Sequence, residues 1–278
     1  METFDADWLA LREPADRRAR DGALPERLCA AWRRHGWSRV VDLGSGTGAN
    51  LRYLAPRLPS GQRWTLVDHD PRHVDRLQRL EAPPEVDAVA AVSRDLAADG
   101  LAVVDDADLV TASALLDLVS ESWLAALVNR CVDTACGAYF ALTCDGQVQW
   151  MTESTAGWRV DDDPDDGFVS SVFNRHQRID KGFGPALGPT AAVAAARLFN
   201  AAGYRTRLAS SAWRLEAGDR RLADQLVEGW AEAAADLRPE HAARVEAWAL
   251  RRRDALSRGS FRVTVGHRDL LALPGDAE

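Results

Sequence analysis

Lysine is almost absent from this chain of 278 residues, in which Lys181 is the only example. A bias toward arginine and alanine accounts for the scarcity, so the one retained lysine stands out. Cysteine is also scarce, and its residues form neither a C-x-x-C pair nor a cluster with histidine. That spacing predicts buried free thiols in place of a disulfide framework or a zinc site. The cysteines are Cys29, Cys131, Cys136 and Cys144.

Long apolar runs are missing too, and none reaches the roughly 18–20 residues of a membrane-spanning helix. The first residues are acidic and lack the basic segment of a secretory signal. The formal net charge of −8 disfavours a nucleic-acid partner, because duplex binding depends heavily on neutralising phosphates. We therefore expect a cytoplasmic protein without a membrane or nucleic-acid partner, and the composition leaves a homodimer open. The length suits one large domain, or one domain with an elaborated cap.

The most informative motif runs from Val40 to Gly48 and reads Val-Val-Asp-Leu-Gly-Ser-Gly-Thr-Gly. Its apolar start predicts a buried strand, and glycine at every second position predicts a sharp turn into a helix. Glycine permits the positive φ of such a turn and lets a ligand approach the backbone. The free N–H groups at the start of the next helix would face that ligand. Asp68 ends the next strand-like run, where an acid is placed to bind ribose hydroxyls, so we predict a nucleotide site.

The spacing of the glycines distinguishes a dinucleotide site from other nucleotide sites. The dinucleotide fingerprint is G-x-G-x-x-G, whereas this chain reads G-x-G-x-G, preceded by Asp42 and followed by Ala49 and Asn50. The motif alone leaves open an NAD(P) protein and a tight turn without a ligand. The pattern resembles the first motif of the class I S-adenosylmethionine (SAM) methyltransferases. Further motifs in the expected order extend this resemblance over about residues 38–145.

The resemblance implies that the chain binds SAM and releases S-adenosylhomocysteine (SAH). In that family the acid after the second strand binds the ribose, and the residue after it often lies against the adenine or the ribose. The segment after the third strand contacts the adenine, and the end of the fourth strand borders the methyl group. The residues thereby assigned to the cofactor are Asp42, Gly44, Ser45, Gly46, Gly48, Asn50, Asp68, His69, Asp95, Leu96 and Ser113.

Strand-like and helical segments alternate along the first half of the chain. Such alternation indicates a parallel sheet that is covered by helices on both faces. With a sixth strand near 203–208 and a last strand at 261–265, we predict a Rossmann-like α/β fold with a seven-stranded, mostly parallel sheet. The earlier strands are expected at 38–43, 63–68, 86–92, 107–112 and 137–143, and the helices between them at 48–57, 71–81 and 121–132.

We predict four regions in this fold. Residues 1–36 form a helical cap, whose arginines could reach the SAM carboxylate or simply face solvent. Residues 37–145 form the SAM-binding core, and residues 146–188 form an irregular lid over the substrate. Residues 189–278 complete the sheet and carry two inserted helices, at about 219–236 and 239–257.

The catalytic candidates lie in the predicted lid. His176 could take a proton near neutral pH, and Asp180 and Lys181 could orient polar groups of the acceptor. The alternative is a surface loop in which these charges pair with one another. The acidic run 161–166 fails the EF-hand pattern, because Gly167 is one place late and Val172 stands where glutamate is needed. We predict a solvated, mobile loop there and no metal site.

Methyl transfer from a sulfonium requires mainly proximity and alignment, so the family has no obligatory catalytic motif. We predict a SAM-dependent methyltransferase that acts on O, N or C of a small molecule. Residues 8–16 and 180–185 further resemble one bacterial subgroup of the family. The alternatives are aminopropyl transfer or cyclisation on the same fold, a non-catalytic SAM-binding regulatory protein, and a methyltransferase for a protein substrate. The Asn/Asp-Pro-Pro-aromatic motif of amino-group methyltransferases is missing after Ser113, which counts against nucleobase methylation.

Overall fold

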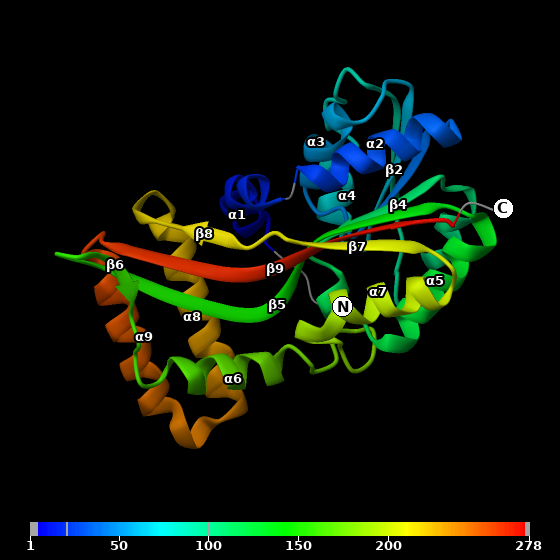
Figure 1. The fold of residues 1–278 in the computed structure, drawn as a ribbon. Helices are drawn as coiled ribbons and strands as arrows, with labels where there is room; N and C mark the ends of the chain where they lie inside the picture. Colours follow the sequence, from blue (N-terminus) through cyan, green and yellow to red (C-terminus); the bar gives the residue numbers. More distant parts are fainter. Residues whose placement is uncertain (1–4, 21, 99, 276–278) are drawn as a thin grey trace.

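The computed structural model describes residues 5–20, 22–98 and 100–275. Its helices alternate with strands through the first half of the chain, as Figure 1 shows. The α-helices are α1 (Ala6–Ala19), α2 (Ala23–His35), α3 (Ala49–Leu54), α4 (Pro71–Leu77), α5 (Glu121–Thr134), α6 (Asp166–His176), α7 (Ala191–Ala201), α8 (Arg220–Leu237) and α9 (Ala242–Ser257). The strands are β1 (Arg39–Leu43), β2 (Gln62–Asp68), β3 (Val86–Ser93), β4 (Leu109–Ser113), β5 (Gly137–Ser154), β6 (Gly157–Val160), β7 (Arg205–Ser210), β8 (Trp213–Leu215) and β9 (Phe261–Leu273).

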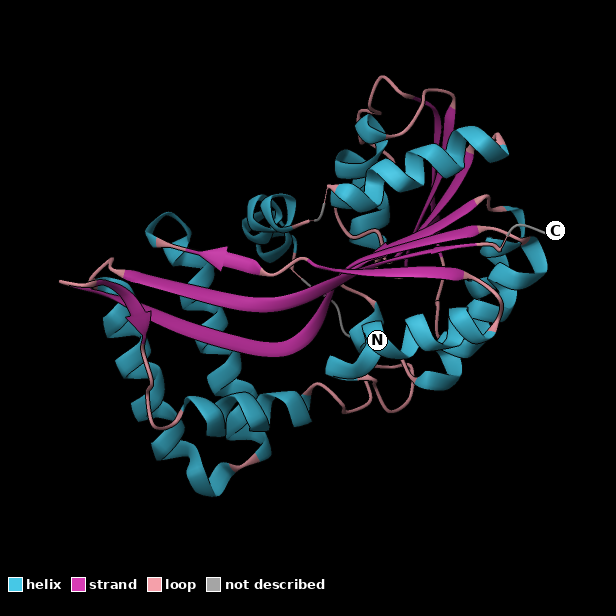
Figure 2. Cartoon of the chain, viewed as in Figure 1, coloured by secondary structure: helices cyan, strands magenta, loops and turns pink. Residues whose placement is uncertain are grey.

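The strands form one mixed sheet with the order β3-β2-β1-β4-β5-β9-β7. Strands β1 to β5 are mutually parallel, and β9 lies antiparallel between β5 and β7. The Rossmann-like α/β prediction is confirmed, but the predicted count of seven strands is wrong. The described residues form nine, because β6 pairs with the far end of β5 and β8 pairs with β9. Both extra strands extend the sheet beyond its parallel part (Figure 2).

Helices cover both faces of the parallel part (Figure 1). One apolar core joins α2 and α3 to the sheet, and it contains the fully buried Trp64. A second core joins α5 and α7 to the opposite face, where Phe140 packs against Phe199. We call this part, residues 22–145 and 186–210 with the end of β9, the core lobe. Its parallel strands all end at one edge, which is where ligands bind in open α/β sheets.

The two longest strands continue past the core lobe and form the base of a second unit (Figure 1). We call residues 147–176 and 213–266 the accessory lobe. Its own core contains Trp150, Trp213 and Trp248 from β5, β8 and α9. The prediction of an irregular lid over 146–188 is therefore wrong in its first part, because β5 runs on to Ser154 and α6 follows. The strand continues because apolar and polar side chains alternate along it: Val148 and Trp150 face the accessory core, while Gln147 and Gln149 are exposed.

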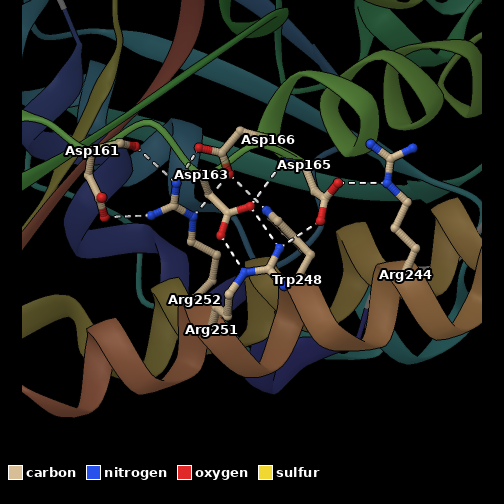
Figure 3. A network of polar contacts seen from close by, with 8 residues as sticks. All are labelled: Asp161, Asp163, Asp165, Asp166, Arg244, Trp248, Arg251 and Arg252. Carbon is tan, nitrogen blue, oxygen red and sulfur yellow. Dashed lines mark hydrogen bonds and ion pairs between the residues drawn. The ribbon is translucent and has the colours of Figure 1, made fainter.

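The acidic run is not a solvated loop, and that prediction is also wrong. Its carboxylates face arginines of α9, as Figure 3 shows. Arg252 pairs with both Asp161 and Asp166 and lies over the Trp150 ring at 4.6 Å. The other contacts are Arg251 with Asp163 and Asp165, Arg244 with Asp165, and Trp248 Nε1 with Asp166. These contacts hold the segment before α6 against α9, and the nearby arginines lower the pKa values of Asp163 and Asp165.

Helix α1 connects the two lobes. Its Ala15 is buried in the accessory core, and Trp213 Nε1 donates a 2.9 Å hydrogen bond to Asp16. The same carboxylate accepts a 3.0 Å hydrogen bond from Arg12, whose guanidinium lies 5.0 Å from the centre of the Trp213 ring. On its other side, α1 places Leu9 over the glycine loop of the core lobe. The helix therefore fixes one wall of the cleft between the lobes.

Candidate functional site

The glycine loop after β1 has the backbone that its sequence predicts. Gly44, Gly46 and Gly48 all have positive φ, at 66°, 52° and 81°. A Cβ added at Gly46 would stand 3.0 Å from Leu9, and one at Gly48 would stand 2.7 Å from Leu80. The missing Cβ at Gly46 keeps the space beside Leu9 open, as close approach of a ligand requires, whereas the missing Cβ at Gly48 lets the loop pack against Leu77 and Leu80.

A pocket of about 100 Å³ lies against this loop. Its walls come from α1, from the ends of β1, β2 and β4, and from the segment before α7. The lining residues are Leu9, Arg12, Gly44, Gly46, Asp68, His69, His73, Leu96, Ser113, Ala114, Leu115, Leu118, Lys181 and Phe183. The pocket thus brings together side chains that are up to 174 positions apart in the sequence, between Leu9 and Phe183.

The residues predicted to bind the cofactor divide into two groups. Six line the pocket, namely Gly44, Gly46, Asp68, His69, Leu96 and Ser113. The other five do not line it and support it from behind or beside, namely Asp42, Ser45, Gly48, Asn50 and Asp95. Ser45 shows the supporting arrangement, because its hydroxyl donates to the Asp42 carbonyl and accepts from the Val67 N–H, which ties β1 to β2.

A buried polar network lies directly beneath the loop. Asn50 donates to Asp42 Oδ1 at 2.7 Å and to Thr111 at 2.9 Å, and Arg20 donates to Asn50 at 2.5 Å. The second carboxylate oxygen of Asp42 has no hydrogen-bond partner among the described residues. Burial raises the pKa of Asp42 to about 6, and the hydrogen bond from Asn50 opposes the shift. These buried hydrogen bonds hold the glycine loop in place, in surroundings of low dielectric constant where such bonds are strong.

Asp68 contributes a carboxylate to the pocket wall and is 5% exposed. Its Oδ2 accepts the Gly46 N–H at 2.8 Å, and its Oδ1 accepts the Asp70 N–H at 2.9 Å. His73 Nδ1 lies 3.6 Å from the same carboxylate. A carboxylate has about four acceptor positions, so Asp68 keeps acceptor capacity toward the pocket.

The wall on the other side of the pocket is apolar. Leu96 follows β3, and its carbonyl accepts a 2.6 Å hydrogen bond from Trp123 Nε1. Trp123 also meets the Phe183 ring edge-on at 5.3 Å. The Asp95 side chain is turned away from the pocket and accepts the Ala97 N–H at 2.9 Å. Of this predicted pair, Leu96 lines the pocket and Asp95 shapes the turn beside it.

A larger cavity of about 630 Å³ adjoins the pocket between the two lobes. Four residues line both spaces, and they are Arg12, Ala114, Leu118 and Lys181. The large cavity falls in the range of about 300–1,000 Å³ that is typical of small-molecule sites. Its other walls include residues of α1, β5, β8, β9, α6 and α8, so it lies between the cofactor edge of the sheet and the accessory lobe.

The three catalytic candidates occupy different positions. His176, the last residue of α6, lines the large cavity, and Lys181 lines both the cavity and the pocket. Asp180 is exposed and lines neither space, and its carboxylate accepts the N–H groups of Gly182 and Gly184. Asp180 therefore folds the loop that carries Lys181 and Phe183.

Sequence reasoning missed several residues of these walls. His267 and Cys144 face the large cavity from neighbouring positions of β9 and β5. Burial and the Arg12 guanidinium lower the pKa of His267 to about 3, and burial raises the pKa of Cys144 to about 12. A signal for His267 exists, because it follows Val263 and Val265 at the alternating positions of a strand-like run. No comparable sequence signal marks His73.

The described residues hold no group of three or more metal-ligating side chains and no helix long and apolar enough to span a membrane. Residues 40–135 match the family described as "Methyltransferase domain", and a search of curated proteins finds no match. Among similar solved structures, a SAM-dependent methyltransferase from Geobacter sulfurreducens with SAH is 15% identical, with a TM-score of 0.43 and 92% of each chain covered. Human N-acetylserotonin methyltransferase with SAM is 17% identical, with a TM-score of 0.42, covering 74% of this chain and 50% of that one.

A putative sarcosine dimethylglycine methyltransferase from Galdieria sulphuraria is 14% identical, with a TM-score of 0.41, covering 90% of this chain and 85% of that one. The matched residues 40–135 begin in β1 and end after α5, so they contain the glycine loop and Asp68. Residues 40–135 therefore form a methyltransferase domain.

Proposed function

We propose that the chain is a class I SAM-dependent methyltransferase that methylates a small molecule at O, N or C, and that this acceptor binds in the cavity of about 630 Å³. The observation that carries the proposal is the shared wall of Arg12, Ala114, Leu118 and Lys181. Methyl transfer needs the acceptor atom and the methyl group in direct contact, and a common wall between the two spaces provides for that contact. The cavity size supports a small acceptor.

The residues of the pocket suit SAM in their chemistry. The cradle at Gly44 and Gly46 would take the part of the cofactor nearest the backbone, and Asp68 would accept the ribose hydroxyls. His69 and Leu96 would border the adenine, and Ser113 would lie near the methionine end. Arg12 is a cation on this wall and would meet the cofactor carboxylate. Asp42, Ser45, Gly48 and Asn50 would act through the loop that they hold.

SAM supplies a methyl group that is activated by the positive sulfur, so the chain itself mainly positions the acceptor. Leu118 and Ala114 would hold the acceptor against the methyl group and exclude water. A base is needed only where the acceptor must lose a proton. His176 is the candidate on the cavity wall for that proton, while Lys181 would orient a polar group of the acceptor.

A cavity-filling variant tests this proposal. Gly229 lies on the α8 wall of the cavity, and no atom stands within 4 Å of a Cβ added there. Gly229→Phe should abolish transfer of label from [methyl-³H]SAM into the low-mass fraction of a cell extract and leave SAM affinity unchanged. Gly218→Phe is the matched control, because Gly218 is equally open and lies outside the cavity. Label found only in protein, or full activity of Gly229→Phe, would overturn the proposal.

A further inference from the structure

Charge is distributed unevenly over the wall of the large cavity. Its two cations, Arg12 and Lys181, are among the four residues that it shares with the cofactor pocket. Helix α8 contributes three carboxylates that lie outside that pocket, Glu228, Glu232 and Asp236. The part of the wall that belongs to the cavity alone is therefore acidic.

Two of the α8 carboxylates are available to a ligand. Glu228 lies 3.4 Å from Arg253, whereas Glu232 and Asp236 form no ion pair within the part of the chain that the structure describes. Both are exposed, and both line the cavity. Carboxylates only accept hydrogen bonds when ionised, so they favour a donor with positive charge.

A buried imidazole adds an independent observation on the same wall. His267 is 5% exposed, and its Nδ1 lies 3.0 Å from the carbonyl oxygen of Val265. Because a carbonyl only accepts, Nδ1 must carry the proton of the neutral ring. The pKa of about 3 keeps the ring neutral at neutral pH. The ring is held in place by Trp213, whose centroid lies 4.7 Å away.

The tautomer of His267 determines whether its Nε2 donates or accepts a hydrogen bond in the cavity. Its Nε2 then bears a lone pair, and it makes no hydrogen bond to any residue in the described ranges. Since His267 forms part of the cavity wall, this nitrogen can receive an O–H or N–H donor only from a bound molecule or solvent. The imidazole and the α8 carboxylates are thus all hydrogen-bond acceptors, and each requires a hydrogen-bond donor from the ligand.

Aromatic rings complete the wall. Trp213 and Trp230 are buried, and Trp8 and Phe173 are partly buried beside them. Aromatic faces attract cations as well as apolar groups, and the attraction increases when the cation is removed from water. The rings therefore suit a body of aromatic size that carries a positive group.

We propose that the methyl acceptor is a small amine with an aromatic-sized apolar body. Glu232 and Asp236 receive its positive charge, and His267 Nε2 receives one of its hydrogen-bond donors. This inference rests on the proposed function and narrows it to one substrate class. The acceptor carries at least two donor sites, one directed to α8 and one to β9.

Three probes with one common body test the charge preference. Tyramine, tyrosol and 3-(4-hydroxyphenyl)propionate carry a cation, a neutral donor and an anion on the same ring, and each keeps the phenol O–H as a second donor. Calorimetry on the protein saturated with SAH should give the amine the lowest Kd, at least about tenfold below that of the propionate, a difference of about 1.4 kcal/mol. The alcohol should lie between them. Equal affinities, tightest binding of the propionate, or no binding of the amine would each overturn the inference.

Matched variants assign the preference to residues. The double variant Glu232→Gln with Asp236→Asn should raise the Kd of the amine about tenfold and leave that of the alcohol unchanged. Asp224→Asn is the control, because this residue of the same helix pairs with Arg253 and lies outside the cavity wall. A loss of amine binding in the control equal to that in the double variant would contradict the assignment to the cavity.

His267 requires its own readout, because it is buried against Trp213. His267→Phe should weaken the amine and the alcohol alike, and His267→Gln should restore part of the binding through its side-chain oxygen. In the native protein, ¹⁵N NMR of labelled histidine should show protonated Nδ1 and unprotonated Nε2, with an Nε2 shift when the amine is added. A protonated Nε2 in the protein without probe would overturn the role of His267.

Fractionation of the extract separates this inference from the proposed function. With [methyl-³H]SAM, the labelled low-mass product should arise from the fraction that a cation exchanger retains at neutral pH. A low-mass product from the unretained fraction would leave the proposed function intact and overturn the inference. The absence of any low-mass product would overturn both.

Discussion

Strands β5 and β9 pass through two different environments along their length. In the core lobe they lie in a sheet whose two apolar faces are covered by helices, and the buried polar groups beneath the glycine loop are joined by hydrogen bonds. In the accessory lobe the same strands pack against Trp248 and α9, and arginines of α9 pair with the acidic run (Figure 3). In the proposed function, the core lobe supports the cofactor pocket, and the accessory lobe supplies the far wall of the acceptor cavity.

This difference indicates that the two lobes carry separable tasks. Changes in the accessory lobe should alter the acceptor cavity and the total stability, with little effect on SAM. Changes at the loop should abolish SAM binding while the accessory lobe stays folded. Helix α1 is the element that links them, because it contacts both the accessory core and the loop. Four substitutions can break or sharpen this separation.

The largest expected effect lies in the accessory lobe. Arg252 has a side chain that is 3% exposed and pairs with two carboxylates. Removing one partner of a buried ion pair costs about 3–5 kcal/mol, so Arg252→Ala should lower the free energy of unfolding by about that amount in urea titrations. Arg251→Ala is the control, with a side chain that is 44% exposed and an expected loss under about 1 kcal/mol. Similar losses in both variants would contradict a special role of the buried arginine.

The next effect concerns the loop. Gly46→Val places a branched side chain at a φ of 52° and toward Leu9, so SAM affinity should fall at least about a hundredfold, or about 2.7 kcal/mol. Gly61→Val is the matched control, since Gly61 also has positive φ, at 88°, but has open space around its Cβ position. Calorimetry should show normal SAM binding in the control. If Gly46→Val retained its affinity for SAM, the loop would not be part of the cofactor site.

A pH-dependent effect is expected from Asp42. Its pKa is raised from 3.8 to about 6 in the folded protein, so the folded state binds the proton more tightly than the unfolded state between these values. Stability from this group therefore increases as pH falls from 7 toward 4, by up to about 3 kcal/mol. The difference in unfolding free energy between wild type and Asp42→Asn should change by that amount over this range. A difference that is independent of pH would show that Asp42 titrates normally.

The smallest of the four effects is expected at the ribose position. Asp68→Ala should weaken SAM by on the order of 1.5–3 kcal/mol, because charge-assisted hydrogen bonds are lost. Asp75→Ala removes an exposed carboxylate of α4 and should leave the Kd unchanged. Normal SAM binding by Asp68→Ala would mean that its carboxylate serves only the Gly46 N–H.

The core lobe was predictable because its signals are local. The glycine spacing between Val40 and Gly48 is sufficient to predict the turn. The alternation of strand-like and helical segments predicted the strands up to β5. The accessory lobe depends on contacts between residues far apart, such as Arg252 with Asp161, 91 positions away, which no spacing rule can show. The sequence around Val148 and Trp150 has the alternation of apolar and polar residues that is typical of a strand. It was nevertheless assigned to the irregular lid predicted over residues 146–188. His267 was missed for a related reason, because its role depends on Val265 and Trp213 around it.

The central claim is that the cofactor pocket and the acceptor cavity meet at Ala114, Leu118, Arg12 and Lys181. A crystal structure of the complex with SAH tests it most directly. The account predicts the adenosine against Asp68 and Leu96, with the sulfur directed at Leu118 and open to the large cavity. A sulfur that is sealed from that cavity, or an SAH molecule bound away from the glycine loop, would contradict the account.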